Sequence, residues 1–259
     1  MASADKFAFV LFRPQSAGNI GAAARALKNM GFDDLRLVAP GTLNNRKREA
    51  VAMAVHADDV LARATIYPDL AAALADCSLA VGTTSRHGGY RSRAVPLRPA
   101  AAELDALAGS NKIAIVFGRE DRGLTNRELK LCHRLITIPT APEYPSLNLA
   151  QAVMVVAYEL MMAANESAAV QASRPPEFVT ASVSDPMLER MADALVSIGF
   201  IPGDNPDHIM YALREILGRS GLTAREVEIF NGMARQMRWV AEGGHRTLAE
   251  KRRAGKKLR

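Results

Sequence analysis

Cysteine is scarce in this chain, which has Cys77 and Cys132 as its only two among 259 residues. Two cysteines cannot form a disulfide framework, and this argues against a secreted protein. The first residues lack a charged segment followed by a long apolar core, so we expect no signal peptide. A membrane span needs about 18 uninterrupted apolar residues, and residues 147–164 are interrupted by Asn148 and Glu159. We therefore expect a soluble, cytoplasmic protein that does not enter a membrane.

Several signatures of catalytic or cofactor sites are also missing. The chain has no Walker A sequence, no G-x-S-x-G nucleophile elbow and no G-x-G-x-x-G dinucleotide fingerprint. Its five histidines are scattered, and the adjacent Cys132 and His133 lack the spacing of metal ligands. These absences predict that the protein holds no metal, and they argue against an oxidoreductase with a nucleotide cofactor.

Positive charge exceeds negative charge, because 33 lysines and arginines face 27 acidic residues and leave a net charge of +6. Such an excess is typical of proteins that bind polyanions, although many chains are mildly basic without such a partner. The basic residues concentrate in residues 86–98 and in a tail from Arg246 to Arg259. The tail could be a solvated end of the chain, whereas the first stretch directly follows an apolar segment.

The first two-thirds of the sequence alternate short apolar segments with helical patterns. We expect strands at residues 7–12, 35–38, 79–82, 112–117 and 135–138, and helices at 19–30, 46–55, 69–75, 99–107, 125–132 and 146–164. This alternation predicts an α/β fold with a mostly parallel sheet and helices on both faces. Ligands of such sheets gather at the carboxyl ends of the strands, so the loops that follow them should carry the chemistry.

The pattern changes near Asn165. Residues 166–184 are rich in serine and contain Pro175 and Pro176, which favours a linker. Apolar residues with helical spacing then predict helices at 185–198, 207–217 and 223–240. The sequence therefore divides into a domain at 1–165, a linker at 166–184, and a small all-α domain at 185–259 that ends in the basic tail.

Two of the predicted strand-end loops are rich in glycine. In "RPQSAGNIGAAAR", residues 13–25, Gly18 and Gly21 stand at a helix start whose free N–H groups favour anions. Asn19 and Arg25 lie nearly two helical turns apart in this segment. The alternative to an anion-binding loop is a plain helix start with an exposed arginine. In "VFGREDRGL", residues 116–124, Glu120 stands between two glycines that allow a tight turn. The alternative to a functional loop at residues 116–124 is a tight turn that carries a solvated charge cluster.

The other two loops are of different kinds. "VGTTSR", residues 81–86, runs from an apolar strand into small hydroxylated residues. "IPTAPEYPSLNLA", residues 138–150, is stiffened by three prolines before a long helix begins. Ser146 is suited to be the N-cap of that helix, and this interpretation leaves Asn148 in the first turn without an explanation.

In this order, the segments resemble the motifs of the SpoU/TrmH group of SPOUT RNA 2′-O-methyltransferases. "GNIGAAAR" is similar to the first motif, "VFGREDRGL" to the second and "IPTAPEYPSLNLA" to the third. "PEYPSLNLAQAVMVVAYEL" and "IGFIPGDNPDHIM" resemble one branch in particular, the TrmJ-type tRNA methyltransferases. The resemblance covers residues 6–165 strongly and residues 185–240 more loosely.

The resemblance implies a SPOUT fold with a C-terminal trefoil knot, a homodimer and the methyl donor S-adenosylmethionine. It also implies tRNA as substrate, methylated on the ribose 2′-oxygen of nucleotide 32, a cytidine or uridine of the anticodon loop. Methylation elsewhere in tRNA or rRNA, and RNA binding without catalysis, are the alternatives. The donor would be held by Thr83, Thr84, Ser85, Gly118, Ile138, Pro145, Ser146 and Leu147.

The same resemblance implies roles for further residues. The catalytic set would be Asn19, Arg25, Glu120, Ser146 and Asn148, and the RNA contacts would be Arg25, Arg86, Arg91 and Arg93. Arginine stays protonated in proteins, so we assign Arg25 to positioning and charge stabilisation and leave the route of the hydroxyl proton open. One departure concerns Gly88, which stands where relatives carry a second arginine two residues beyond Arg86.

Overall fold

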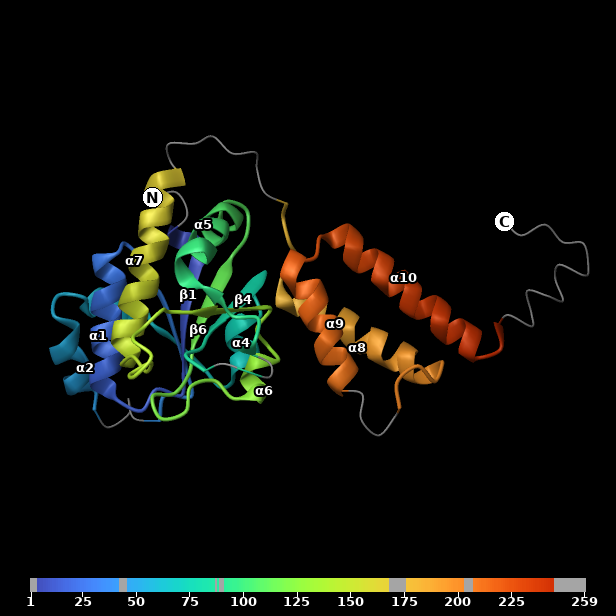
Figure 1. Ribbon diagram of the computed structural model, residues 1–259, viewed down its shortest axis with the longest axis horizontal. Helices are drawn as coiled ribbons and strands as arrows, with labels where there is room; N and C mark the ends of the chain where they lie inside the picture. The colour runs from blue at the N-terminus through green and yellow to red at the C-terminus, as the bar shows by residue number, and fades with distance from the viewer. Residues whose placement is uncertain are drawn as a thin grey trace, which may run out of the picture. The chain divides into compact units, whose positions relative to one another are not determined.

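The computed structural model describes residues 4–41, 46–86, 88, 91–167, 176–202 and 207–244 (Figure 1). The chain forms two compact units, Met1–Ala181 and Ser182–Arg259. The basic tail lies outside the described residues, as do His87, Gly89 and Tyr90 of the basic stretch at 86–98. Among the helices in the described part of the chain, none is long and apolar enough to cross a membrane.

A seven-stranded sheet forms the centre of the first unit. Its strands are β1 (Phe7–Phe12), β2 (Asp34–Val38), β3 (Thr65–Tyr67), β4 (Leu79–Thr83), β5 (Val95–Pro96), β6 (Ile113–Phe117) and β7 (Arg134–Thr137). They lie in the order β3-β2-β1-β6-β4-β7-β5, and each neighbouring pair is parallel. The α/β fold predicted from the alternation is confirmed. After β3 the chain crosses to the other side of β1, and such a reversal opens a crevice at the carboxyl ends of the strands.

Helices cover both faces of this sheet. They are α1 (Ala17–Asn29), α2 (Lys47–Ala54), α3 (Asp58–Arg63), α4 (Leu70–Leu74), α5 (Leu97–Ala108), α6 (Asn126–Leu129) and α7 (Leu149–Ser167). The cores on the two faces show that α1, α5 and α7 pack on one face, and α4 and α6 on the other. Because the middle of a parallel sheet is buried on both faces, the central strands β1 and β6 are wholly apolar.

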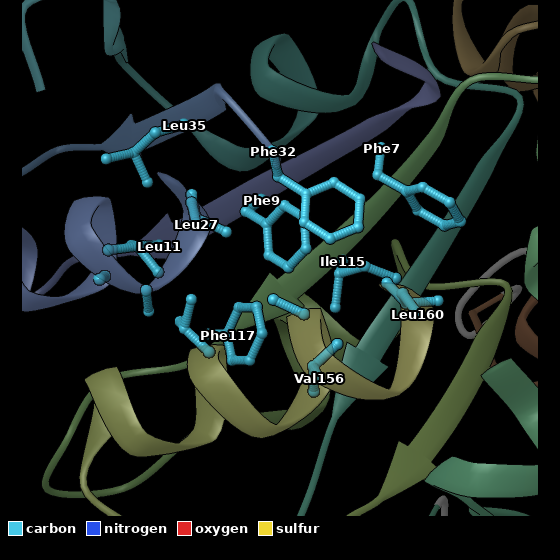
Figure 2. Packing of buried hydrophobic residues seen from close by; sticks show 14 of the residues in the cluster. Phe7, Phe9, Leu11, Leu27, Phe32, Leu35, Ile115, Phe117, Val156 and Leu160 are labelled. Carbon is cyan, nitrogen blue, oxygen red and sulfur yellow. The ribbon is translucent and has the colours of Figure 1, made fainter. Parts of the chain in front are cut away.

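The strand β1 shows how one short segment supplies both cores. Successive side chains of a strand point to opposite faces, so Phe7, Phe9 and Leu11 join the core beneath α1 and α7. Ala8 and Val10 join the core beneath α4. In Figure 2 the Phe9 ring lies between Phe32 and Phe117, and its centroid is 5.1 Å and 6.3 Å from theirs. The larger side chains of β1 thus fill the space beneath the longer helices.

Four short elements were not predicted from the sequence. They are the 3-10 helix η1 (Ala4–Lys6) and α3, β3 and β5, which have three, six, three and two residues. The strand β3 lies at the edge of the sheet, and its Ile66 is 57% exposed. Segments this short fall below the windows over which a helical or an alternating pattern can be recognised. Only their pairing with β2 and β7 identifies β3 and β5 as strands.

In its described residues, 182–202 and 207–244, the second unit contains three helices, α8 (Ala181–Ser197), α9 (Asp207–Ser220) and α10 (Ala224–Ala241). Its core joins Met191, Ala194 and Leu195 of α8 to Ile201 and to Ala234 of α10. Thr223 and Glu226 form a capping box at the start of α10. All three predicted helices are present, and α8 begins earlier than the predicted residue 185.

Part of the segment predicted as a linker is packed against the first unit. Asn111 is 2% exposed, and its side chain donates to the carbonyls of Leu107 and Pro176 and accepts from the Phe178 N–H. Ser78 donates to the Phe178 carbonyl over 3.1 Å, and the Phe178 ring is buried. The serine and proline content of this stretch predicts flexibility, but a buried amide with both a donor and an acceptor secures its backbone.

Candidate functional site

A cavity of about 380 Å³ opens at the carboxyl ends of β4, β6 and β7. It is lined by the loop after β4, the loop after β6, and the segment between β7 and α7. The residues predicted to hold the methyl donor, which are Thr83, Thr84, Ser85, Gly118, Ile138, Pro145, Ser146 and Leu147, all line it. The structure therefore brings three segments that are distant in the sequence to one place, at the edge of the sheet where a ligand is expected.

Hydroxyl and backbone groups hold the first of these loops in shape. Thr83 donates its hydroxyl to the Val116 carbonyl over 3.1 Å, and the Thr84 N–H donates to the Ile136 carbonyl over 3.0 Å. The Thr84 hydroxyl in turn accepts from the Arg86 N–H. The loop after β4 is thus fixed to both neighbouring strands, which preorganises one wall of the cavity.

The loop after β6 is a tight turn that needs both of its glycines. Arg119 and Gly123 pair across it, and the Gly123 N–H donates to the Arg119 carbonyl over 2.8 Å. A Cβ on Gly118 would stand 2.2 Å from the Gly123 carbonyl carbon, and Gly123 itself has a φ of +64°. The sequence prediction of a tight turn is confirmed, and the turn directs Glu120 towards the start of α1.

A chain of hydrogen bonds joins the three motifs. The Asn19 amide donates to the Glu120 carboxylate over 3.1 Å, and the Asn148 amide donates to the Asn19 side-chain oxygen over 3.0 Å. Glu120 also accepts from the backbone N–H groups of Gln15 and Ser16. Three of the five residues predicted as catalytic are therefore in direct contact through their side chains.

Asn148, and not Ser146, caps helix α7. The helix begins at Leu149, and the Asn148 side-chain oxygen accepts from the N–H groups of Ala150 and Gln151. The Gln151 side chain reaches back to the Asn148 N–H over 3.3 Å, which completes a capping arrangement. The N-cap interpretation of Ser146 is wrong, since the helix begins only after Asn148; Ser146 is an exposed residue of the cavity lining.

At the start of α1, side chains of the protein itself accept hydrogen bonds from the backbone N–H groups of residues 15, 16, 18 and 19. Glu120 accepts from Gln15 and Ser16, Glu49 of α2 accepts from Gly18, and the Ser16 hydroxyl caps Asn19. Of the two interpretations of this segment, these contacts favour the plain helix start over an anion site. Carboxylates of the protein itself take the place that the helix N-terminus offers to negative charge.

The predicted RNA-contacting arginines divide into two groups. Arg86 and Arg91 line the cavity, whereas Arg25 and Arg93 are exposed outside its lining. Arg91 is tied to the neighbouring loop, because its guanidinium donates to the Leu124 carbonyl and to Asn126. Arg25 lies six residues beyond Asn19 on α1, which is a rise of about 9 Å along the helix axis.

Two further arginines at the cavity were not singled out by the sequence reasoning. Arg119 and Arg122 line it together with Asp121, which accepts hydrogen bonds from both. The pKa of Asp121 is lowered to about 2, mainly by the hydrogen bonds from Arg119. The charged segment "REDR", residues 119–122, was the sequence signal for these two arginines. Only the fold brings them into the same cavity lining as Arg86. The lining contains more arginine than carboxylate side chains, which suits a polyanion.

The cavity fits the methyl donor that the resemblance implies. Small-molecule sites typically measure about 300–1,000 Å³ and combine apolar walls with a few placed polar groups. Here Phe117, Ile138 and Leu147 supply apolar surface, and Thr84 and Ser85 supply hydroxyl groups. Within the described residues, no group of three histidine, cysteine or acidic side chains is placed to hold a metal ion.

Both cysteines are buried. Burial raises the pKa of each thiol, that of Cys77 and that of Cys132, to about 12. Thiols with such pKa values stay protonated at neutral pH, and neither residue lines the cavity. The site therefore offers oxygen and amide groups, rather than a thiolate nucleophile.

Comparisons with known proteins agree with this geometry. Residues 6–158 match the SpoU rRNA Methylase family, and residues 184–252 match the C-terminal domain of the tRNA methyltransferase TrmJ. The chain is 37% identical over 254 residues to the tRNA (cytidine/uridine/adenosine-2′-O-)-methyltransferase TrmJ of Pseudomonas aeruginosa, covering 92% of this chain and 96% of the relative. It is 41% identical to the tRNA (cytidine/uridine-2′-O-)-methyltransferase TrmJ of Cronobacter sakazakii, covering 86% and 92%.

A solved structure supports the same assignment. The crystal structure of TrmJ from Z. mobilis aligns with a TM-score of 0.74 at 34% identity, over 89% of this chain and 98% of that chain. Both units of the fold are thus accounted for by one group of relatives. The chain belongs to the SpoU methylase family of S-adenosylmethionine-dependent RNA methyltransferases, and it carries the C-terminal domain typical of TrmJ.

Proposed function

We propose that this enzyme transfers the methyl group of S-adenosylmethionine to a ribose 2′-hydroxyl of tRNA, at nucleotide 32 of the anticodon loop. One observation carries the proposal: a single cavity gathers every residue predicted to hold the donor, beside the Glu120–Asn19–Asn148 chain of hydrogen bonds. The relatives act on cytidine and uridine, and one of them also on adenosine, according to their names. We assign this chain to cytidine and uridine.

The parts of the chain divide the work in this proposal. Residues 1–165 form the catalytic domain, and the helical domain at 185–259 with its basic tail holds the tRNA. The segment predicted as a linker at 166–184 joins them, and Asn111 secures its residues 176–178. We further propose that the enzyme acts as a homodimer in the cytoplasm. The trefoil knot remains a prediction from the family resemblance.

The reaction demands little besides positioning. S-adenosylmethionine supplies an electrophilic methyl group when it is bound. The protein must then hold the 2′-hydroxyl in line and provide a route for its proton. Ser146 and Asn148 stand where the cavity meets the hydrogen-bonded chain, and we place them closest to the reacting atoms.

Of the remaining catalytic residues, Glu120 and Asn19 orient Asn148, whereas Arg25 acts on the RNA. Glu120 accepts from Asn19, and Asn19 accepts from Asn148, so the carboxylate orients both amides. Arg25 is exposed on α1 outside the cavity lining. A guanidinium there can pair with an RNA phosphate, because it stays charged and has five donors. Arg86, Arg91 and Arg93 complete the proposed RNA contacts.

Incubation with isotopically labelled S-adenosylmethionine and unmodified tRNA tests the function. We expect label on the 2′-oxygen of nucleotide 32, located by nuclease digestion and mass spectrometry. A folded enzyme that binds the donor but labels no ribose would contradict the proposal. Calorimetry with the donor alone separates the non-catalytic alternative, since a protein that only binds RNA has no need of that ligand.

A further inference from the structure

Tyr144 is an unusually exposed aromatic residue beside the cavity. It is 79% exposed, the largest fraction among the large apolar side chains of the described residues. The next three residues, Pro145, Ser146 and Leu147, all line the cavity. A tyrosine ring that is exposed to this extent gains little free energy from burial. Its position beside the cavity therefore suggests that a binding partner covers it.

The loop that carries Tyr144 is held in one shape. The Tyr144 N–H donates to the Ala141 carbonyl over 3.1 Å, and the Thr140 hydroxyl donates to the Pro145 carbonyl over 3.3 Å. Pro142 and Pro145 restrict the backbone on either side of it. The ring is therefore presented by a stiffened loop, and a partner that contacts it has little backbone freedom to remove.

Positive charge lines the same cavity. Arg86 and Arg122, which we call the rim arginines, are both exposed and both belong to the cavity lining. Guanidinium groups beside an exposed aromatic ring are the usual means by which proteins hold single-stranded nucleic acid. Phosphates pair with the cations, and unstacked bases lie on the ring. A protein partner or a lipid would not need this combination.

We propose that the Tyr144 ring stacks on an unpaired base of the substrate, next to the ribose that enters the cavity. This inference rests on the proposed function and extends it to a residue that positions the RNA. The ribose can bring its 2′-oxygen into the cavity at the sheet edge only if its nucleotide unstacks from the neighbouring bases of the RNA loop. Stacking on Tyr144 compensates for the base stacking that the RNA loop gives up, and it favours unpaired over paired nucleotides.

The test compares Tyr144→Ala with Tyr144→Phe, which keeps the ring and loses only the hydroxyl. Ile66→Ala is the matched control, because Ile66 is 57% exposed on the edge strand β3. For Tyr144→Ala, we expect kcat/KM for tRNA to fall about tenfold or more, as loss of one stacked base implies. Tyr144→Phe and Ile66→Ala should stay within about twofold, and calorimetry should give all variants the same donor affinity.

A spectroscopic measurement adds a readout that a structural role would not move. An anticodon stem-loop RNA with 2-aminopurine in its loop should lose fluorescence on binding the wild type and Tyr144→Phe. Tyr144→Ala should leave that fluorescence unquenched at RNA concentrations that saturate it. Quenching by Tyr144→Ala equal to that by the wild type would overturn the proposal.

Other outcomes also decide the matter. A kcat/KM of Tyr144→Ala equal to that of the wild type would overturn the stacking role. A change in the oligomeric mass of this variant in analytical ultracentrifugation would also overturn it, and would assign the ring to a protein interface. Weakened donor binding would assign it to the cavity instead. Failure of the proposed function is distinguishable from all of these, because the wild-type enzyme itself would then leave tRNA unmethylated.

Discussion

At the scale of single residues, Glu120 shows how one side chain can organise a site. Its carboxylate accepts hydrogen bonds from Gln15, Ser16 and Asn19, which belong to another motif. Hydrogen bonds to an ionised acceptor are stronger than those between neutral groups. Glu120 therefore holds the start of α1 against the loop after β6, and the amide of Asn19 is oriented as a consequence.

A second charged cluster has a structural role. Arg36 on β2 is 3% exposed and donates to Asp34, Asp76 and the Ala73 carbonyl. Lys112 pairs with both carboxylates. None of these residues lines the cavity. A buried guanidinium with this many partners is satisfied, but it becomes costly if a partner is removed.

Acid should weaken this cluster. The hydrogen bond from Arg36 holds the pKa of Asp76 well below its usual range. A carboxyl with a lowered pKa in the folded state stabilises the fold above its unfolded pKa of about 3.9 and loses that contribution as the pH falls further. We expect Asp76→Asn to lower the free energy of unfolding at pH 7, and the difference from wild type to shrink below about pH 4.

Urea unfolding followed by circular dichroism, at pH values from neutral to acid, measures this difference. Asp5→Asn is the control, because Asp5 is exposed near the chain start. A gap between Asp76→Asn and wild type that stays constant down to the lowest pH would show that the ion pairs with Arg36 contribute nothing to acid sensitivity.

At the scale of elements, helix α7 is joined to the site through its cap. Asn148 uses its side-chain oxygen for the helix and its amide N–H for Asn19. The two functions can be separated by mutation. Asn148→Asp would keep the acceptor oxygen and remove the donor, whereas Asn148→Ala would remove both.

We expect Asn148→Asp to keep its thermal stability and to lose turnover. Asn148→Ala should lose about 1 kcal/mol of stability as well, which is the usual contribution of an N-cap. Thermal unfolding and single-turnover methylation, measured on the same preparations, check both statements. Wild-type turnover in Asn148→Asp would mean that the Asn148–Asn19 hydrogen bond is not needed for catalysis.

The packing of α1 on α2 depends on one glycine. A Cβ on Gly21 would stand 1.9 Å from the Ala50 carbonyl oxygen, which is backbone and cannot turn aside. At Gly18 the nearest atom is the Glu49 carboxylate oxygen at 3.1 Å, at the end of a flexible side chain. The two positions therefore form a matched pair on one helix.

Gly21→Ala should destabilise the protein by about 3 kcal/mol, since overpacking forces the backbone of α2 away. Gly18→Ala should change stability by less than about 1 kcal/mol, because the Glu49 side chain can move. Urea midpoints of both variants decide between them. Equal midpoints would contradict the close approach of α2 to α1.

At the scale of the whole molecule, Arg25 and the cavity proposed for the donor occupy different surfaces. The cavity holds the proposed donor site, whereas Arg25 is exposed on α1 outside the lining. Arg25→Ala should therefore lower kcat at least about tenfold and leave the Kd of S-adenosylmethionine within about twofold, as expected for a group that acts only after donor binding.

Rapid-quench methylation and calorimetry measure these two quantities. Lys28→Ala is a useful control, because Lys28 is also exposed on α1 and pairs with Asp59. If donor affinity falls as much as turnover in Arg25→Ala, the assignment of Arg25 to the RNA would be wrong.

Much of the fold follows from local pattern. The strand β1 has the bounds that its apolar run of β-type residues predicts, and Gly31 lies just after the end of α1. The three motifs identify the family because their glycines and polar residues are local in sequence. Asn148 and Ser146 illustrate the limit, since both residues are able to cap a helix and only the helix start at Leu149 decides between them.

The sequence by itself determined the alternation of strands and helices, the two units and the segments that form the site, because hydrophobic period and turn residues are local properties. Only the tertiary structure decided that Glu120 meets Asn19 across 101 positions and that Asn148 meets Asn19 across 129. It also decided that carboxylates occupy the start of α1 and that Asn111 secures residues 176–178. Such contacts depend on which strands become neighbours, and no local pattern contains the strand order β1-β6-β4-β7.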